Sequence, residues 1–271
     1  MKRPVLSVII PWCNRQELPA VIEANKSVFD KHDLEVIIAN VGGDTQMIRN
    51  VVRPGVRICQ ILSCKFNKSM ALNLGVHVSN ADNLFFLDTD ILLTEDFLSS
   101  AMTVIQDRGT VVVDKVLETA MLNTRSDDND LIEEIVTYLE VRAKNGRRAI
   151  IQNRRDSFTH FNRVGNGLIF VSKKDFLAVD GMNSGLAGWG FEDDDFLLRL
   201  QLGAGLRATA MGTVTHLTHD NRMRDLNGQS VEEQIKMNYT IAVQRYKAGN
   251  YRGSYTSDME KWAGQFEIVG Q

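Results

Sequence analysis

The 271-residue chain contains few cysteines, few prolines and no long hydrophobic run. Its three cysteines, Cys13, Cys59 and Cys64, are too few and too irregularly spaced for a disulfide framework or a four-cysteine zinc site. No apolar run approaches the roughly 20 residues that cross a membrane, and the N-terminus carries no signal-peptide pattern. Internal repeats and proline-rich linkers are lacking as well. These absences predict a reduced, cytoplasmic protein, either free or at a membrane surface, unless an anchor lies outside this sequence.

Charge of either sign is also not in large excess. The formal net charge is −3, which gives no overall electrostatic reason to expect nucleic acid, although Arg147–Arg148 and Arg154–Arg155 form two local basic pairs. Apolar residues make up 44% of the chain and charged residues 24%, an ordinary globular composition that argues against long disorder. The length fits one large α/β domain or two small ones.

Short apolar runs alternate with segments of helical periodicity. Strands are predicted at 5–10 (ended by Pro11), 34–39, 56–62, 83–87, 111–116, 168–171 and 208–215. Helices are predicted after the polar turn 13–17 to about Lys31, after residues 66–68 through Val76, over 130–143, from 193 onward and from 230 to about 247. This alternation predicts an α/β fold with a doubly wound, largely parallel sheet, in which ligands bind at the carboxyl ends of the strands.

The stretch from Ala187 to Phe196 combines a tryptophan between two glycines with four consecutive carboxylates at a predicted helix start. An acidic first turn complements the helix dipole, but four neighbouring acids repel one another, so capping alone is a poor explanation. Glycines allow the backbone to approach a ligand closely, and the Trp189 indole offers a flat face for a sugar ring. A carboxylate beside that face can accept a proton from a sugar hydroxyl. Asp193 shares the helix face of Leu197 and Leu200 and should point inward, whereas Asp194 and Asp195 should turn away.

A second acidic motif, Asp88-Thr-Asp90, follows a predicted strand directly. Two carboxylates on a turn can hold one hard divalent cation that bridges the phosphates of a nucleotide diphosphate. A solvated turn is the alternative, because acidic pairs are common. His216 follows an alternating segment and can complete a site that suits manganese better than calcium, with His219 as a competitor or a phosphate contact.

Cationic and aromatic residues near other strand ends can serve the same ligand. Arg15 can bind phosphate through two parallel hydrogen bonds, while Phe66 and Lys68 can offer a face for a base and a positive charge. Taken singly, each of these residues also fits a surface or core role.

The pieces together match a known pattern in order. Val8–Glu17, Phe66–Gly75 and Leu87–Asp90 resemble the nucleotide-binding part of GT-A glycosyltransferases. Gly167–Phe176, Gly181 and Gly188–Asp195 resemble the acceptor half of β-1,4-galactosyltransferases and of chondroitin-polymerase-like bacterial enzymes.

This resemblance implies a single GT-A domain over residues 1–271. Its parts would be a nucleotide-sugar-binding half (1–116), a variable middle segment (117–165), an acceptor and catalytic half (166–229) and a C-terminal helix and tail (230–271). It also implies inverting, Mn²⁺- or Mg²⁺-dependent transfer of a hexose or N-acetylhexosamine. The donor would be a UDP-sugar, and the acceptor a hydroxyl of a saccharide or glycoconjugate.

The resemblance also assigns roles to individual residues. Asp90 would be the main metal ligand, with Asp88 nearer the ribose and His216 completing the metal site. Asp193 would be the general base. The donor would contact Pro11, Asn14, Arg15, Asn40, Phe66, Lys68, Asp88 and His219, and the acceptor would contact Trp189, Gly190 and Glu192.

The chain departs from the pattern at two places. Cys13 stands where the animal galactosyltransferases carry an arginine, and Asn40-Val41 replaces the paired acids of many GT-A enzymes. The missing Golgi anchor favours a bacterial or viral setting. The two arginine pairs suggest glycosylation of nucleic acid, which the acidic balance of the chain disfavours. Two further alternatives stay open. One is retaining hexosaminyl transfer to a peptide, because polypeptide N-acetylgalactosaminyltransferases have a similar tryptophan–acidic block. The other is a non-catalytic nucleotide-sugar-binding module.

Overall fold

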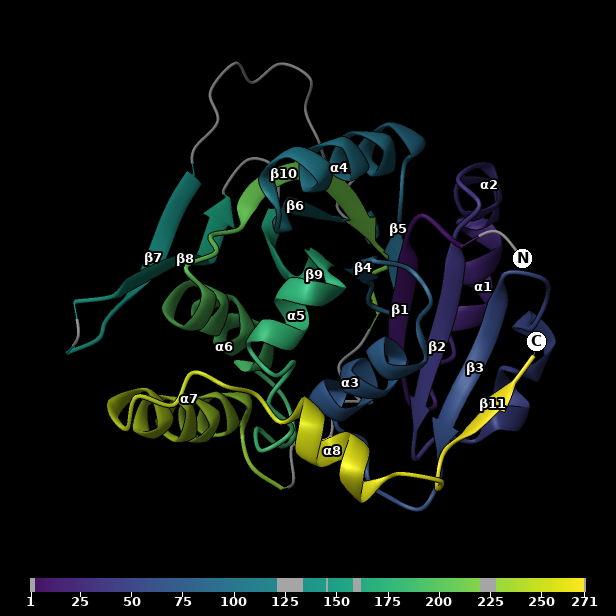
Figure 1. Cartoon of the computed structure of the whole chain (residues 1–271). Coiled ribbons are helices and arrows are strands. Elements are labelled where there is room, and N and C mark those ends of the chain that lie inside the picture. The colour runs from purple at the N-terminus through teal and green to yellow at the C-terminus, as the bar shows by residue number, and fades with distance from the viewer. Residues whose placement is uncertain (1–2, 121–133, 145, 158–161, 220–227, 271) are drawn as a thin grey trace, which may run out of the picture.

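A nine-stranded mixed sheet forms the centre of the protein (Figure 1). The structure is a computed structural model that describes residues 3–120, 134–144, 146–157, 162–219 and 228–270. The sheet contains β1 (Ser7–Trp12), β2 (Glu35–Val41), β3 (Val56–Ile61), β4 (Asn83–Phe86), β5 (Ile91–Leu92), β6 (Val111–Glu118), β9 (Asn162–Ser172), β10 (Thr209–His216) and β11 (Glu267–Val269). The helices are α1 (Leu18–Ala24), α2 (Lys26–Lys31), α3 (Lys68–Val78), α4 (Glu95–Arg108), α5 (Lys173–Ala178), α6 (Glu192–Arg199), α7 (Val231–Lys247) and α8 (Tyr255–Lys261).

The strand order is β11-β3-β2-β1-β4-β9-β6-β10-β5. The block β3-β2-β1-β4 is parallel, as the alternating strand and helix pattern of the first half predicts, and β6 and β10 are parallel to each other. Between these blocks β9 runs antiparallel to both β4 and β6, and the edge strands β5 and β11 are antiparallel as well. The α/β class is confirmed, and the sheet is mixed rather than largely parallel.

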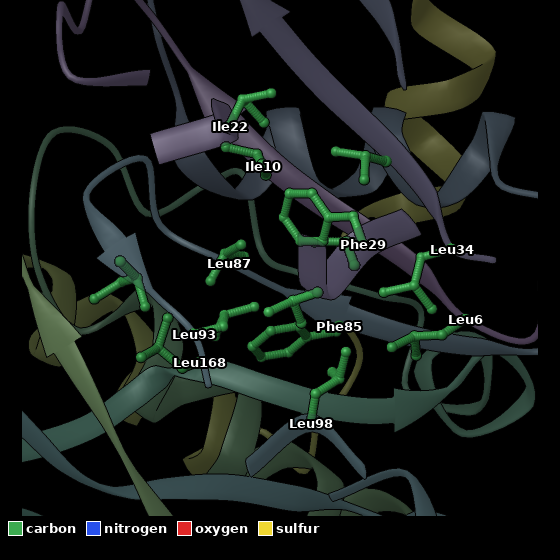
Figure 2. Packing of buried hydrophobic residues seen from close by; sticks show 14 of the residues in the cluster. Leu6, Ile10, Ile22, Phe29, Leu34, Phe85, Leu87, Leu93, Leu98 and Leu168 are labelled. Atoms are coloured by element: carbon green, nitrogen blue, oxygen red, sulfur yellow. The ribbon is translucent and has the colours of Figure 1, made fainter. Parts of the chain in front are cut away.

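Hydrophobic packing covers both faces of the sheet. Along β1, Val8 and Ile10 pack into the cluster shared with α1, α2 and α4, whereas Ile9 packs into the cluster shared with α3 and α6. Figure 2 shows the first cluster, in which Phe29 of α2 and Phe85 of β4 fill the centre. A strand flanked by helices on both sides must be apolar at every position, which explains the continuous runs in the sequence. Within the described ranges, no helix has the length and apolar character to cross a membrane.

Strand β1 continues through Pro11 to Trp12, so the prediction that proline ends this strand is wrong. The Ile9 carbonyl accepts a hydrogen bond from Leu87 N at 3.0 Å, so odd-numbered residues of β1 direct their backbone polar groups toward β4. Pairing with β4 ends at Ile9. The nitrogen of Pro11 therefore points to the side of β4, where the pairing has already ended, so its lack of an N–H breaks no strand hydrogen bond.

The helix predicted over 130–143 is wrong for residues 134–142, which form β7 (Glu134–Arg142); residues 130–133 lie outside the described part. Strand β7 pairs antiparallel with β8 (Arg148–Ser157), and this hairpin extends beside the main sheet (Figure 1). Thr137 and Tyr138 are both exposed, which breaks the alternation of inward and outward residues that would identify β7 as a strand, and the register with β8 shifts at the same point. Pairing with β8, which the local sequence pattern of residues 134–142 does not indicate, determines the extended conformation.

The buried face of α6 also differs from the prediction, because Asp195 does not turn away from the core. Its side chain and that of Arg199 are both 0% exposed, and Arg199 Nε donates to Asp195 Oδ2 at 2.7 Å. The Tyr246 hydroxyl of α7 donates to the other carboxylate oxygen at 2.6 Å. Asp195 therefore joins α6 to α7 inside the protein.

We expect Asp195→Asn to lower the free energy of unfolding by about 3–5 kcal/mol, because the variant leaves the Arg199 charge buried without its counter-ion. Denaturant unfolding followed by circular dichroism measures this loss. The matched control is Asp30→Asn, which breaks the exposed Lys26–Asp30 pair of the same (i, i+4) spacing and should leave stability nearly unchanged. Equal effects of the two variants would contradict the structural role given to Asp195.

Candidate active site

The loop before α6 holds the tryptophan–glycine motif in an unusual backbone conformation. Gly190 has φ +96°, and Phe191, the N-cap residue of α6, has φ +74°, a left-handed conformation that costs energy for an aromatic residue. Asn238 of α7 donates to the carbonyl of Gly190 at 2.8 Å and to that of Ala187 at 3.1 Å. Helix α7 therefore fixes the loop that carries Trp189.

A cavity of about 920 Å³ lies where this loop meets the carboxyl ends of β1, β4 and β10. It is lined by nearly all residues that the sequence singles out: Pro11, Asn14, Arg15, Phe66, Lys68, Asp88, Asp90, Trp189, Gly190, Glu192, Asp193, His216 and His219. The residues expected to bind the UDP-sugar and those expected to bind the sugar acceptor therefore line the same cavity.

Asn40 is the exception, because it does not line this cavity. Its side chain is fully buried and closes its own loop, donating to Gly43 O and Thr45 Oγ1 at 3.0 Å and accepting from Gly43 N at 2.9 Å. These bonds use both amide hydrogens and the oxygen. This geometry does not support Asn40 as a residue that contacts the UDP-sugar. The Asn40 side chain instead fixes its own loop, which also contacts Asn14.

Asp90, His216 and His219 converge at one end of the cavity. Asp90 Oδ2 lies 2.8 Å from His219 Nε2 and 3.4 Å from His216 Nε2, and the three side chains can offer ligand atoms within 4.8 Å of one another. Burial alone would raise the pKa of Asp90, but the hydrogen bonds from the two imidazoles outweigh it and hold the pKa below its usual range. One carboxylate oxygen and two imidazole nitrogens fit a first-row divalent ion such as Mn²⁺.

Asp88 is not a member of this group, although the sequence suggests it as a second ligand. It lies 3.1 Å from Lys68 Nζ, which also contacts Asp193 Oδ2 at 2.8 Å. Burial disfavours the ammonium, but Asp193, Asp88 and Glu192 outweigh it and raise the pKa of Lys68. The Lys68 ammonium therefore pairs with two carboxylates: Asp88, expected to contact the UDP-sugar, and Asp193, expected to contact the sugar acceptor.

Gly167 leaves room for this bridge, a role that the sequence did not reveal. A Cβ atom at Gly167 would lie 2.8 Å from Asp193 Oδ2 and 2.9 Å from Lys68 Nζ. The motif that begins at Gly167 does not predict this steric role, because the crowding comes from α3 and α6. Glu118 was missed for a similar reason: it lines the cavity and contacts His216, which is 98 residues away.

The first turn of α6 presents two carboxylate oxygens that lack hydrogen-bond partners among the described residues. These atoms are Glu192 Oε2 and Asp193 Oδ1, both inaccessible to solvent. Burial, reinforced by the charge of Asp193, raises the pKa of Glu192 to about 7. Burial likewise raises the pKa of Asp194 to about 6, against hydrogen bonds from Asn166 and Asn153. Asp194 also lines the cavity, so the prediction that it turns away is wrong.

Because Glu192 has a raised pKa, it should destabilise the ligand-free protein at high pH. Between 4.5 and about 7 the folded state keeps a proton that the unfolded chain releases, so the free energy of unfolding falls as pH rises. Glu192→Gln should therefore gain stability relative to wild type, by up to about 3 kcal/mol, between about pH 5 and about pH 8. Urea unfolding at both pH values measures the gain. Glu233→Gln should instead lose stability relative to wild type as pH rises, because hydrogen bonds from Ser230 lower the pKa of Glu233 in the folded state.

The mixed sheet with a cavity at its strand ends has the arrangement of the GT-A fold. The sequence model of the family described as "Glycosyltransferase like family 2" matches residues 7–259. The chain belongs to this family, and the resemblance indicated by the sequence motifs is confirmed.

Curated relatives match over short segments. The chain is 32% identical to xylosylprotein 4-beta-galactosyltransferase of Caenorhabditis elegans over 73 residues, 24% of this chain and 25% of that protein. It is 33% identical to beta-1,4-galactosyltransferase 7 of Drosophila melanogaster over 61 residues, 22% of this chain and 19% of that protein. The matched segments thus span a quarter or less of these relatives.

Two solved structures are similar over most of the chain. The structure of Staphylococcus aureus TarS 1–349 covers 96% of this chain and 72% of its own, with 13% identity and a TM-score of 0.51. The catalytic domain of Drosophila beta1,4galactosyltransferase 7 in complex with xylobiose covers 86% and 79%, with 16% identity and a TM-score of 0.48. At such identities the TarS likeness supports the fold alone.

Proposed function

We propose that this protein is a metal-dependent, inverting glycosyltransferase that moves a hexose or N-acetylhexosamine from a UDP-sugar to a hydroxyl of a saccharide or glycoconjugate. The observation that carries the proposal is the pair of unpartnered, buried carboxylate oxygens on Glu192 and Asp193. Glu192 and Asp193 both line the cavity that also contains Asp90, His216 and His219. A buried acceptor atom without a donor is costly unless a ligand supplies one, and a sugar hydroxyl is such a donor.

The proposed donor end consists of Arg15, Phe66, Asp88, Asp90 and His219, with Lys68 between the two ends. Arg15 Nη1 lies 3.3 Å from His219 Nδ1, so its guanidinium is next to the metal group and suitably placed to bind a phosphate. Asp90, His216 and His219 would hold Mn²⁺ or Mg²⁺, which when bound screens the charge that develops on the departing diphosphate.

In the proposed reaction Glu192 holds one acceptor hydroxyl and Asp193 accepts the proton of the attacking hydroxyl. The hydroxyl oxygen forms a bond to the anomeric carbon, the bond from that carbon to the UDP oxygen breaks, and UDP leaves with the electron pair. Asp193 Oδ2 is held by Lys68, which leaves Oδ1 for the proton. Trp189 provides the apolar face for the acceptor ring.

The test is UDP release from a panel of UDP-sugars with the full chain, with and without MnCl₂. UDP-galactose is the first donor to try, because both curated relatives are named galactosyltransferases. Manganese-dependent UDP release, increased by a saccharide acceptor and yielding a product of inverted anomeric configuration, is the expected result. Tight UDP-sugar binding without release would favour a non-catalytic binding module, and a retained configuration would favour the retaining alternative.

Trp189→Ala should raise the acceptor KM or lower kcat while leaving UDP affinity nearly unchanged, because the indole belongs to the acceptor end of the cavity. Acceptor-dependence curves and calorimetric titration with UDP in MnCl₂ separate the two effects. Trp262→Phe is a control for tryptophan loss outside the cavity and should change neither quantity. If Trp189→Ala unfolds or loses UDP binding, the indole is a structural residue and its acceptor role is wrong.

A further inference from the structure

Glu118, at the last position of β6, contacts a histidine of the metal group. Its Oε2 lies 2.7 Å from His216 Nδ1, while His216 Nε2 faces Asp90. The sheet explains this placement, because β10 lies between β6 and β5 and His216 is in register with both Glu118 and Ile91. An imidazole whose Nδ1 donates to a carboxylate keeps the lone pair of Nε2 for a metal.

The same carboxylate also fixes the segment between the two histidines. Thr218 Oγ1 donates to Glu118 Oε2 at 3.1 Å, and Thr218 N donates to Thr119 Oγ1 at 3.0 Å. On the other side Leu217 N donates to the carbonyl of Asp90 at 2.8 Å. Residues 216–219 are thus held between the end of β6 and the turn that carries Asp90.

We propose that Glu118 is a positioning residue for the metal site, which orients His216 directly and His219 through Thr218. The proposal rests on the proposed metal dependence and adds a residue that no sequence motif marks. Arg163 Nε donates to the other Glu118 oxygen, Oε1, at 3.3 Å, so the two carboxylate oxygens have different partners and the side chain has little freedom to rotate away from His216.

The test measures Mn²⁺ binding to the full chain without substrate, from the electron paramagnetic resonance signal of free Mn²⁺. Glu118→Ala should weaken Mn²⁺ binding roughly 10–100-fold, the usual effect of losing such a partner of a metal-bound histidine. Glu118→Gln, which retains an acceptor oxygen for His216, should recover part of this loss. The visible absorption spectrum of bound Co²⁺, which reports the ligand geometry, should change in Glu118→Ala and less in Glu118→Gln.

The matched control is Asp114→Asn on the same strand. Asp114 and Glu118 have similarly exposed side chains, 28% and 25%, and each pairs with an arginine, but Asp114 contacts no histidine in the described structure. Its loss should leave Mn²⁺ affinity unchanged. If Glu118→Ala does not fold, Glu118→Gln tests the contact with His216, and Thr218→Val tests the link to His219, because it removes the hydroxyl that donates to Glu118.

The outcomes separate this inference from the proposed function. If wild type binds no Mn²⁺, the metal dependence and the role of Glu118 both fail. If wild type binds Mn²⁺ and His216→Ala weakens binding while Glu118→Ala and Glu118→Gln bind like wild type, only the role of Glu118 is overturned. Wild-type Mn²⁺ binding by Thr218→Val overturns only the action of Glu118 on His219.

Discussion

Asp193→Asn should lower kcat by roughly 10²–10⁴-fold, the usual contribution of a general base, while Mn²⁺ and UDP affinity stay unchanged. The asparagine keeps the shape of the side chain and an oxygen for Lys68, but it cannot take the proton of the acceptor hydroxyl. Steady-state transfer rates at saturating donor and acceptor, with UDP titrations on the same preparations, measure the separation between chemistry and binding.

Asp194→Asn is the matched control for this variant. Asp194 is the next residue of α6, lines the same cavity and accepts hydrogen bonds from Asn166 and Asn153 instead of contacting Lys68. Its replacement removes the same charge from the same helix turn and should cost far less in kcat. Transfer by Asp193→Asn at near wild-type rate, or equal losses in the two variants, would show that Asp193 is not the base.

The sequence predicts those parts of the fold that depend on local pattern. Strand β1, strand β4 and the capping box of Ser230 and Glu233 all follow from short-range rules and are present. The β7–β8 hairpin does not follow from such rules, because a register shift hides its alternation and its partner strand decides the conformation. The prediction that Asp195 turns away from the core is wrong for a related reason. The helical periodicity of α6 does not show that Tyr246 of α7 covers the face that carries Asp195.

The candidate site is predictable to the extent that its residues follow strand ends. Asp88 and Asp90 follow β4, and Arg15 follows β1, so chain position alone places them at one edge of the sheet. Asn40 is also at a strand end, yet its amide is used by its own loop. Glu118 gains its role only when β6 and β10 pair, which brings it to His216, 98 positions away. Gly167 gains its role only when α3 and α6 bring Lys68 and Asp193 against it.

Asp90→Ala should abolish metal-supported UDP binding, because it removes the carboxylate that both histidines face. His216→Ala should weaken binding less, by roughly 10–100-fold, because the Asp90 carboxylate, the anionic member of the group, remains with His219. Calorimetric titration with UDP in MnCl₂, in CaCl₂ and in excess chelator measures both effects, and wild type should bind better with manganese than with calcium.

Chelation provides the internal control for this prediction. If Asp90 acts through the metal, excess chelator should reduce wild type to the level of Asp90→Ala and should have no further effect on the variant, so the two losses are not additive. Circular dichroism checks that the variant is folded. Full transfer activity of wild type in excess chelator would rule out metal dependence. Additive losses would instead mean that Asp90 contacts the donor independently of the ion.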